Sequence, residues 1–139
     1  MISDLLDLTP TELDQLKKQN VGDLTGLTSQ QAIERYPRLH QIWRSSSNEA
    51  PIPNAEPFST FRSRMVAAFD RISTQHRDSC VAVVCHGGVL KTYLNHLVGL
   101  ATHYSPFHFA NGSVGGVETS PDQPRVLWLN STCHLRRSL

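Results

Sequence analysis

A histidine followed by two glycines stands where an apolar run meets the start of a helical pattern. Residues 81–85 (Val-Ala-Val-Val-Cys) are apolar, and His86, Gly87 and Gly88 follow them directly. The first N–H groups of a helix have no intrahelical partner and carry the positive end of its dipole, so they attract a phosphate. The two glycines lack a Cβ, so a ligand can approach the backbone closely, and they can adopt a positive φ where a turn needs one. We therefore predict a phosphate-binding loop in which His86 lies against the phosphate.

Two other interpretations of this loop stay open. A strand-to-helix turn can carry a histidine that has no role beyond ending the strand. A His-Gly-Gly sequence also forms the oxyanion loop of lipase-type hydrolases, which need a Gly-x-Ser-x-Gly elbow elsewhere. The nearest match is residues 111–115 (Asn-Gly-Ser-Val-Gly), where asparagine replaces the first glycine, so the sequence disfavours this interpretation. Cys85 is expected in the core because neighbouring strand residues point to opposite faces, away from His86.

The composition is that of one globular domain. The chain has 139 residues, of which 39% are hydrophobic and 18% are charged, and its formal net charge is +1. A chain of this length can bury a core without disulfides or metal. The charge balance argues against disorder and against a nucleic-acid surface. Three cysteines without a Cys-x-x-Cys pair predict neither a zinc site nor a disulfide framework.

The sequence also bears on location and cofactors. The first residues are acidic where a signal peptide is basic, and no apolar run approaches the ~20 residues of a membrane span. We expect a cytoplasmic protein with neither a membrane nor a nucleic acid as partner. We also expect no cofactor and no metal, because His96, His103 and His108 are too irregularly spaced to form a metal-binding pair on one helix.

Two capping signals predict helices in the first part of the chain. Residues 9–12 (Thr-Pro-Thr-Glu) predict a helix over residues 10–18. Residues 28–31 (Thr-Ser-Gln-Gln) predict a second helix, which should stop near Tyr36 because Pro37 cannot continue it.

Helical spacing of apolar residues predicts two more helices. The longest should begin at Phe58 and leave Arg62 and Arg64 towards solvent. Another should follow the two glycines and end before Gly99. Residues 44–54 are rich in Ser, Asn and Pro and predict a surface loop.

Four segments have the character of strands. The uninterrupted apolar run at residues 81–85 predicts a strand covered on both faces, as in a parallel sheet. Residues 107–110, 114–119 and 125–130 predict further strands, with connections that suit antiparallel neighbours. The predicted fold class is α/β: a three-layer αβα sandwich with a mixed, mostly parallel sheet, in one domain over residues 1–139.

Several motifs together resemble the histidine phosphatase, or phosphoglycerate mutase-like, superfamily. Residues 22–28 (Gly-Asp-Leu-Thr-Gly-Leu-Thr) are similar to the family's Gly-x-x-Glu-Gly-Leu-Thr loop. Glu56, Phe61 and Arg64 resemble its Gly-Glu-Ser…Phe…Arg helix start. The resemblance covers nearly the whole chain in the family's order, through these segments: residues 22–28, 34–37, 55–64, 81–100, and 111–113 with 129–135.

The resemblance implies a phosphoglycerate mutase-like fold and phosphomonoester hydrolysis or phosphoryl transfer. The ligand would be a small phosphorylated molecule or inorganic phosphate. His86 corresponds to the family's second catalytic histidine, which stabilises the transferring phosphoryl group. Gly87 and Gly88 would bind the phosphate beside it.

The sequence departs from the family at the nucleophile and the acid. Family members begin with a strand ending in Arg-His-Gly, whose histidine is phosphorylated during turnover, and this sequence contains no Arg-His-Gly. The family's acid lies four residues before the loop glycine, here Gly22, and that position is Lys18. A lysine is a poor proton donor to a phosphate ester unless its pKa is strongly lowered. The chain thus resembles the family's domain without its first strand-helix unit, and we expect it to be inactive unless another chain supplies the nucleophile.

The alternative function is a non-catalytic domain that binds a phosphate ligand or associates with itself. In the family the first strand lies beside the His86 strand, so its absence would expose backbone donors and acceptors along an apolar edge. We expect a homodimer or higher self-association to cover this edge, or residues 1–8 to lie against it.

Overall fold

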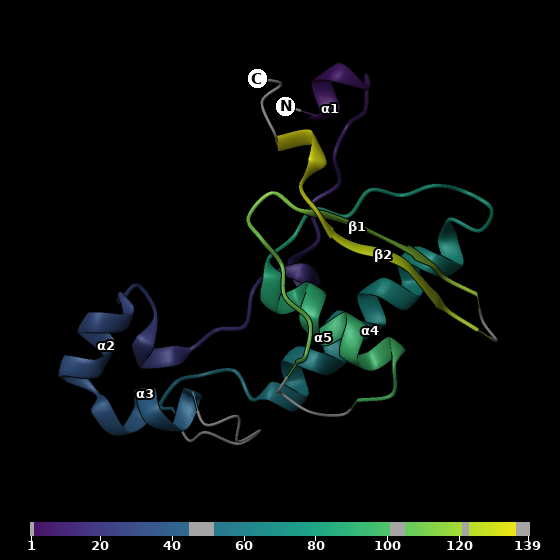
Figure 1. Ribbon diagram of the computed structural model, residues 1–139. Helices are drawn as coiled ribbons and strands as arrows, with labels where there is room; N and C mark the ends of the chain where they lie inside the picture. Colours follow the sequence, from purple (N-terminus) through teal and green to yellow (C-terminus); the bar gives the residue numbers. More distant parts are fainter. Residues whose placement is uncertain (1, 45–51, 101–104, 121–122, 136–139) are drawn as a thin grey trace.

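The computed structural model describes residues 2–44, 52–100, 105–120 and 123–135. In chain order the elements are α1 (Ile2–Leu5), the 3₁₀ turns η1 (Asp14–Leu16) and η2 (Gly22–Leu24), α2 (Ser29–Arg35), α3 (Pro37–Arg44), α4 (Phe58–Gln75), α5 (Gly87–Leu97), β1 (Val114–Glu118), β2 (Arg125–Ser131) and η3 (Cys133–Leu135). Helices α2 and α3 lie together on one side of α4 and α5 (Figure 1). None of the helices in the described ranges has both the length and the apolar character that a membrane crossing requires.

The predicted helix over residues 10–18 is wrong, and only the short turn η1 forms there. The reason is the lack of an apolar face to bury: Leu13 and Leu16 are half-buried, while the other residues of this stretch are exposed. A short helix is marginal in water without tertiary packing.

The second capping signal is confirmed. The Thr28 Oγ1 atom accepts from the Gln31 N–H at 3.2 Å, and the Gln31 Oε1 atom accepts from the Thr28 N–H at 2.9 Å. Helix α2 ends at Arg35, and Pro37 then begins α3. Proline is favoured at the first helical position because that N–H has no partner in any case.

Helices α4 and α5 form the main core, and both were predicted. Their buried side chains are Phe58, Phe61, Met65, Phe69, Val89 and Tyr93. The rings of Phe69 and Tyr93 stack with centroids 3.8 Å apart. Gly99, which follows the C-cap of α5, adopts a φ of 75°, a conformation that glycine reaches without a steric penalty. A smaller cluster under α2 contains Leu24, Ala32 and Ile52.

The predicted strands at residues 114–119 and 125–130 are confirmed as β1 and β2, which pair antiparallel. The predicted strand at residues 107–110 does not form. Residues 81–85 also form neither strand nor helix, and no backbone hydrogen bond joins them to another described residue. A strand exists only through its ladder, and within the described ranges this segment has no neighbour to pair with.

The α/β class holds, but the described residues contain one sheet, the two-stranded pair of β1 and β2. The three-layer sandwich with a mostly parallel sheet is therefore not formed by this part of the chain. A parallel ladder would have to include residues 81–85, which run as an unpaired trace between the end of α4 and the start of α5 (Figure 1). Of the loop predicted at residues 44–54, residues 45–51 lie outside the described ranges.

Candidate functional site

His86 is the N-cap residue of α5. Its backbone is extended, with φ −88° and ψ 151°, and its carbonyl accepts from the N–H groups of Val89 and Leu90 at 2.9 and 3.1 Å. The imidazole makes no capping hydrogen bond and is exposed. The His86 side chain therefore faces solvent at the helix start.

Gly87 and Gly88 form an open first turn. In the described part of the chain, no hydrogen bond uses the N–H of either residue. A Cβ placed on either glycine would find no heavy atom within 4 Å. Neither glycine has a positive φ. The lack of a Cβ therefore serves to leave open space beside the backbone here, and not to form a left-handed turn. The two N–H groups thus lie at the positive end of α5 without a hydrogen-bond partner among the described residues.

The segment that leads to His86 is anchored on one face. Val83 and Cys85 pack against the core of α4 and α5, and the cysteine that was predicted in the core is half-buried there. Burial raises the pKa of the Cys85 thiol to about 11. The thiol therefore stays protonated near neutral pH and is no nucleophile for the neighbouring site.

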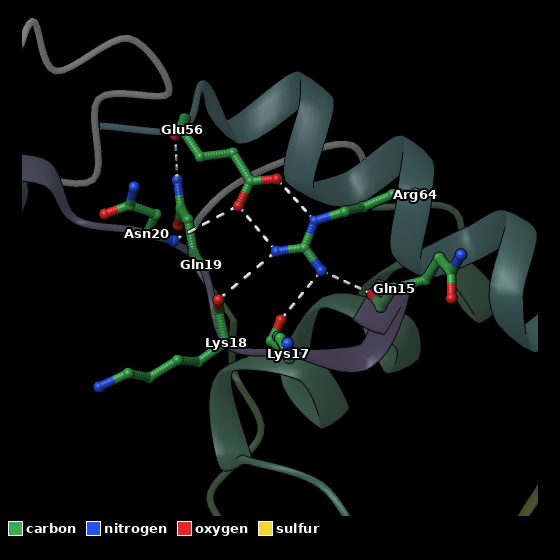
Figure 2. Close-up of polar contacts among 7 residues, drawn as sticks. All are labelled: Gln15, Lys17, Lys18, Gln19, Asn20, Glu56 and Arg64. Carbon is green, nitrogen blue, oxygen red and sulfur yellow. Dashed lines mark hydrogen bonds and ion pairs between the residues drawn. The ribbon is translucent and has the colours of Figure 1, made fainter. Parts of the chain in front are cut away.

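A bidentate ion pair joins Glu56, just before α4, to Arg64 in the second turn of this helix. Arg64 donates to both carboxylate oxygens of Glu56, from Nε at 2.6 Å and from Nη2 at 2.7 Å (Figure 2). These hydrogen bonds lower the pKa of the Glu56 carboxyl and raise that of Arg64. The prediction that Arg64 points towards solvent is wrong, because its side chain is 24% exposed and that of Glu56 is 14% exposed.

The same arginine binds the segment that carries Lys18. Arg64 donates to the backbone carbonyls of Gln15 at 2.6 Å, Lys17 at 3.0 Å and Lys18 at 3.4 Å. The Lys18 side chain points away from the ion pair (Figure 2). Arg64 therefore binds the backbone carbonyl of Lys18, and the Lys18 ammonium group stays free to face solvent.

Two further backbone contacts hold this segment at the start of α4. The Gln19 side chain donates to the Glu56 carbonyl at 2.9 Å, and the Glu56 N–H donates to the Asn20 carbonyl at 2.9 Å. Leu16 packs against the main core cluster, and η1 contacts α4. The segment that carries Lys18 is therefore held against the start of α4.

Gly22 closes the loop after this segment. Its φ is +56°, and an added Cβ would overlap the carbonyl of Pro53 and lie 2.5 Å from the Ala55 nitrogen. The Asp23 N–H donates to the Pro53 carbonyl at 3.1 Å. Only glycine fits here, because φ lies in the left-handed region and the backbone of residues 53–55 lies against Gly22.

The second predicted solvent-facing arginine is also in contact with protein. The Arg62 Nη2 atom lies 3.2 Å from His96 Nδ1, joining α4 to the last turn of α5. His103 lies outside the described ranges, and His108 is exposed. Across the described residues, no group of His, Cys, Asp and Glu side chains has an arrangement that could hold a metal ion.

The ion pair of Glu56 and Arg64 was not anticipated as a pair from sequence. Glu56 precedes α4, and its carboxylate binds a side chain eight residues later in the chain. Arg64 lies three residues after Phe61 on α4, and its guanidinium carbon is 5.1 Å from the centre of the Phe61 ring. This position beside a core residue was the sequence signal that Arg64 contacts protein.

Sequence comparison matches residues 1–132 to the profile of the histidine phosphatase superfamily (branch 1). The metal-independent phosphoserine phosphatase of Arabidopsis thaliana is 36% identical over 81 residues, which are 58% of this chain and 34% of that protein. The uncharacterized phosphatase PhoE of Bacillus subtilis (strain 168) is 21% identical over 135 residues, 97% of this chain and 64% of that protein.

The fold has solved counterparts. Bacillus stearothermophilus YhfR superposes with a TM-score of 0.81 and 21% sequence identity, covering 90% of this chain and 63% of the YhfR chain. The chain spans less than two thirds of the length of these relatives. A profile match over nearly all of the chain, in agreement with the shared fold, shows that this chain belongs to branch 1 of the histidine phosphatase superfamily.

Proposed function

We propose that this chain carries the phosphate-binding side of a histidine phosphatase site and does not hydrolyse phosphate esters by itself. The ligand is inorganic phosphate or a small phosphate monoester, bound without a cofactor. The observation that carries the proposal is the exposed His86 N-cap, next to two glycine N–H groups that have no partner within the described residues. Family membership supplies the chemical class, since the curated relatives include phosphatases.

The geometry supports anion binding through three groups. The N–H groups of Gly87 and Gly88 can donate to phosphate oxygens, and the helix dipole adds attraction of about 0.3–1 kcal/mol for an exposed anion. His86 adds a third donor from a ring nitrogen.

The absence of hydrolysis follows from the residue types. The sequence has no Arg-His-Gly to provide a phosphorylated histidine, and Lys18 occupies the acid position of the family. Loss of a single preorganised donor commonly costs about 10²- to 10³-fold in rate. Without the nucleophile itself, no covalent route is available to these residues.

A non-catalytic domain is the second candidate function. In that case the His86 loop binds a phosphate ligand without converting it, and the surface around residues 81–85 binds another protein chain. The exposed apolar side chains of Val81 and Val84 favour this possibility. We also propose that residues 1–139 act as one domain, with the three-layer sandwich completed only when strands pair with residues 81–85.

The test combines binding and turnover on three proteins: the unchanged chain, His86→Ala, and His76→Ala as a matched control. His76 is an exposed histidine at the C-terminal end of α4. We expect phosphate to shift the NMR amide signals of Gly87 and Gly88 in the unchanged chain and in His76→Ala, and much less in His86→Ala. We expect none of the three proteins to hydrolyse para-nitrophenyl phosphate above background.

Two outcomes contradict the proposal separately. Hydrolysis by the unchanged chain that disappears in His86→Ala would refute the inactivity. Amide signals that do not respond to phosphate in any of the three proteins would refute the binding site.

A further inference from the structure

Thr92, in the second turn of α5, turns its hydroxyl back towards the start of the helix. The Oγ1 atom donates to the Gly88 carbonyl at 2.9 Å. Thr92 is 6% exposed, so this hydrogen bond forms away from solvent. The helix pattern also directs the Thr92 N–H to the same carbonyl, which lies four residues earlier. The hydroxyl is therefore an additional donor to a carbonyl that has a main-chain partner.

A series of hydrogen bonds leads from this hydroxyl to the Gly87 N–H. The Gly88 carbonyl and the Val89 N–H belong to one peptide group, which is planar and conjugated. The Val89 N–H donates to the His86 carbonyl at 2.9 Å. That carbonyl shares a peptide group with the Gly87 N–H. Two hydrogen bonds and two peptide groups thus separate the Thr92 hydroxyl from the Gly87 N–H.

Hydrogen bonds in such a series polarise one another. A donor at a peptide carbonyl makes the N–H of that peptide a stronger donor, by about 10–30% per bond, and the effect is larger away from water. The Gly87 N–H stands at the end of the series and has no partner among the described residues. The Thr92 hydroxyl therefore strengthens a donor that is open to a ligand.

The neighbouring glycine provides an internal comparison. The Gly88 N–H belongs to the peptide group that carries the Gly87 carbonyl, and the Thr92 hydroxyl bonds the Gly88 carbonyl instead. The polarisation should therefore reach the Gly87 N–H and largely bypass the Gly88 N–H.

The hydroxyl also orders a turn that side-chain packing does not hold. Gly87 and Gly88 have the largest conformational freedom of any residue type, and a Cβ on either would meet no heavy atom within 4 Å. Thr92 and Val89, by contrast, are buried in α5. A hydrogen bond from Thr92 therefore ties the glycine turn to the packed part of the helix.

We propose that Thr92 is a positioning residue for the phosphate-binding turn of α5. Its hydroxyl orders this turn and polarises the peptide groups that end at the Gly87 N–H, and it does not itself touch the phosphate. The effect on phosphate rests on the proposed function, whereas the effect on the Gly87 N–H does not.

The experiment compares variants that separate the hydroxyl from the shape of the side chain. Thr92→Val removes the hydroxyl and keeps the branched shape, while Thr92→Ser keeps the hydroxyl and loses a buried methyl group. Thr92→Ala also lacks the hydroxyl and repeats the comparison if Thr92→Val does not fold. Thr74→Val is the matched control, because the Thr74 hydroxyl donates to the carbonyl four residues earlier, that of Asp70, at 2.8 Å on α4.

The first readout is the NMR spectrum without phosphate. We expect the Gly87 amide proton to move upfield in Thr92→Val, because its peptide group is less polarised, and the Gly88 amide proton to move less. Thr92→Ser and Thr74→Val should leave the Gly87 signal near its position in the unchanged chain.

The second readout is the affinity for inorganic phosphate, from titration of the same signals. Thr92→Val should bind phosphate about two- to fivefold more weakly than the unchanged chain, and Thr92→Ser nearly as well. The melting temperatures should follow the opposite order, because Thr92→Ser loses a buried methyl group. A purely structural role of Thr92 would make the affinity follow the melting temperature.

Three results would overturn the inference. They are a Gly87 signal that Thr92→Val moves no more than Thr74→Val does, equal displacement of the Gly87 and Gly88 signals, and weaker phosphate binding by Thr92→Ser than by Thr92→Val. Failure of the unchanged chain to bind phosphate would refute the proposed function instead, and the signals without phosphate would still decide whether Thr92 polarises the Gly87 N–H.

Discussion

Arg64 and Glu56, eight residues apart, form a two-point ion pair with distances of 2.6 and 2.7 Å. The guanidinium group uses its remaining donors on backbone carbonyls of residues 15, 17 and 18 (Figure 2). One side chain therefore joins the start of α4 to a segment nearly 50 residues earlier in the chain. Because both partners are mostly buried, this contact holds the Lys18 segment against the start of α4.

Arg64→Met should lower the free energy of unfolding by about 1–3 kcal/mol, because it leaves the Glu56 carboxylate and the carbonyls without their charged donor. Urea denaturation followed by circular dichroism measures this loss. Lys17→Met is the matched control, since the Lys17–Asp14 pair at 2.8 Å is exposed. The control should leave the midpoint unchanged. Equal effects of the two changes would contradict the structural role of Arg64.

The stability should depend on pH through Glu56. Hydrogen bonds from Arg64 lower the pKa of this carboxyl in the folded state, so its contribution is complete above the unfolded value of about 4.3. The contribution should be lost as the pH falls through the lower, folded-state pKa. Urea titrations between neutral pH and this acidic range should show a steeper decline for the unchanged chain than for Glu56→Gln. Parallel curves for the two proteins would show that Glu56 does not titrate with folding.

Gly22→Ala should destabilise the chain more than Gly26→Ala. Both glycines have a positive φ, so the backbone strain of about 1–2 kcal/mol is common to the two changes. An added Cβ at Gly22 meets the backbone of Pro53 and Ala55, whereas one at Gly26 has no heavy atom within 4 Å. Thermal melts of both variants measure the difference. A larger loss for Gly26→Ala would be inconsistent with the close approach of residues 22 and 53.

Alkylation should distinguish the three cysteines. Burial raises the pKa of Cys85 to about 11, so little thiolate forms at pH 8 and the reagent has limited access. Cys80 and Cys133 are exposed. Iodoacetamide followed by peptide mass spectrometry should therefore label Cys80 and Cys133 first in the native chain, and all three at similar rates in urea. Early labelling of Cys85 in the native chain would show that the segment before His86 is not packed on α4 and α5.

The isolated chain should self-associate. Exposed apolar side chains around residues 81–85 and a net charge of only +1 both favour association between copies. Sedimentation velocity should show dimers or larger species that grow with concentration. A monomer at all concentrations would contradict this prediction.

The sequence by itself determined those elements that depend on residues within one or two helical turns of each other. The capping pair of Thr28 and Gln31, the apolar spacing of α4, and Gly99 after α5 each act between near neighbours, and each appears where the sequence predicts it. The turn into α5 is of the same kind, because a helix start needs only a cap and open donors. His86, Gly87 and Gly88 could therefore be placed from sequence alone.

Tertiary structure decided the features that join distant residues. The apolar run at residues 81–85 has the composition of a strand, but a strand also needs hydrogen-bonding neighbours, and the described chain supplies none. Arg64 looked like a solvent-facing position on α4, yet its direction depends on Glu56 and on carbonyls nearly 50 residues away. The residue pattern of a segment indicates which contacts it can make. Whether a partner is present depends on where the other segments lie in the folded chain.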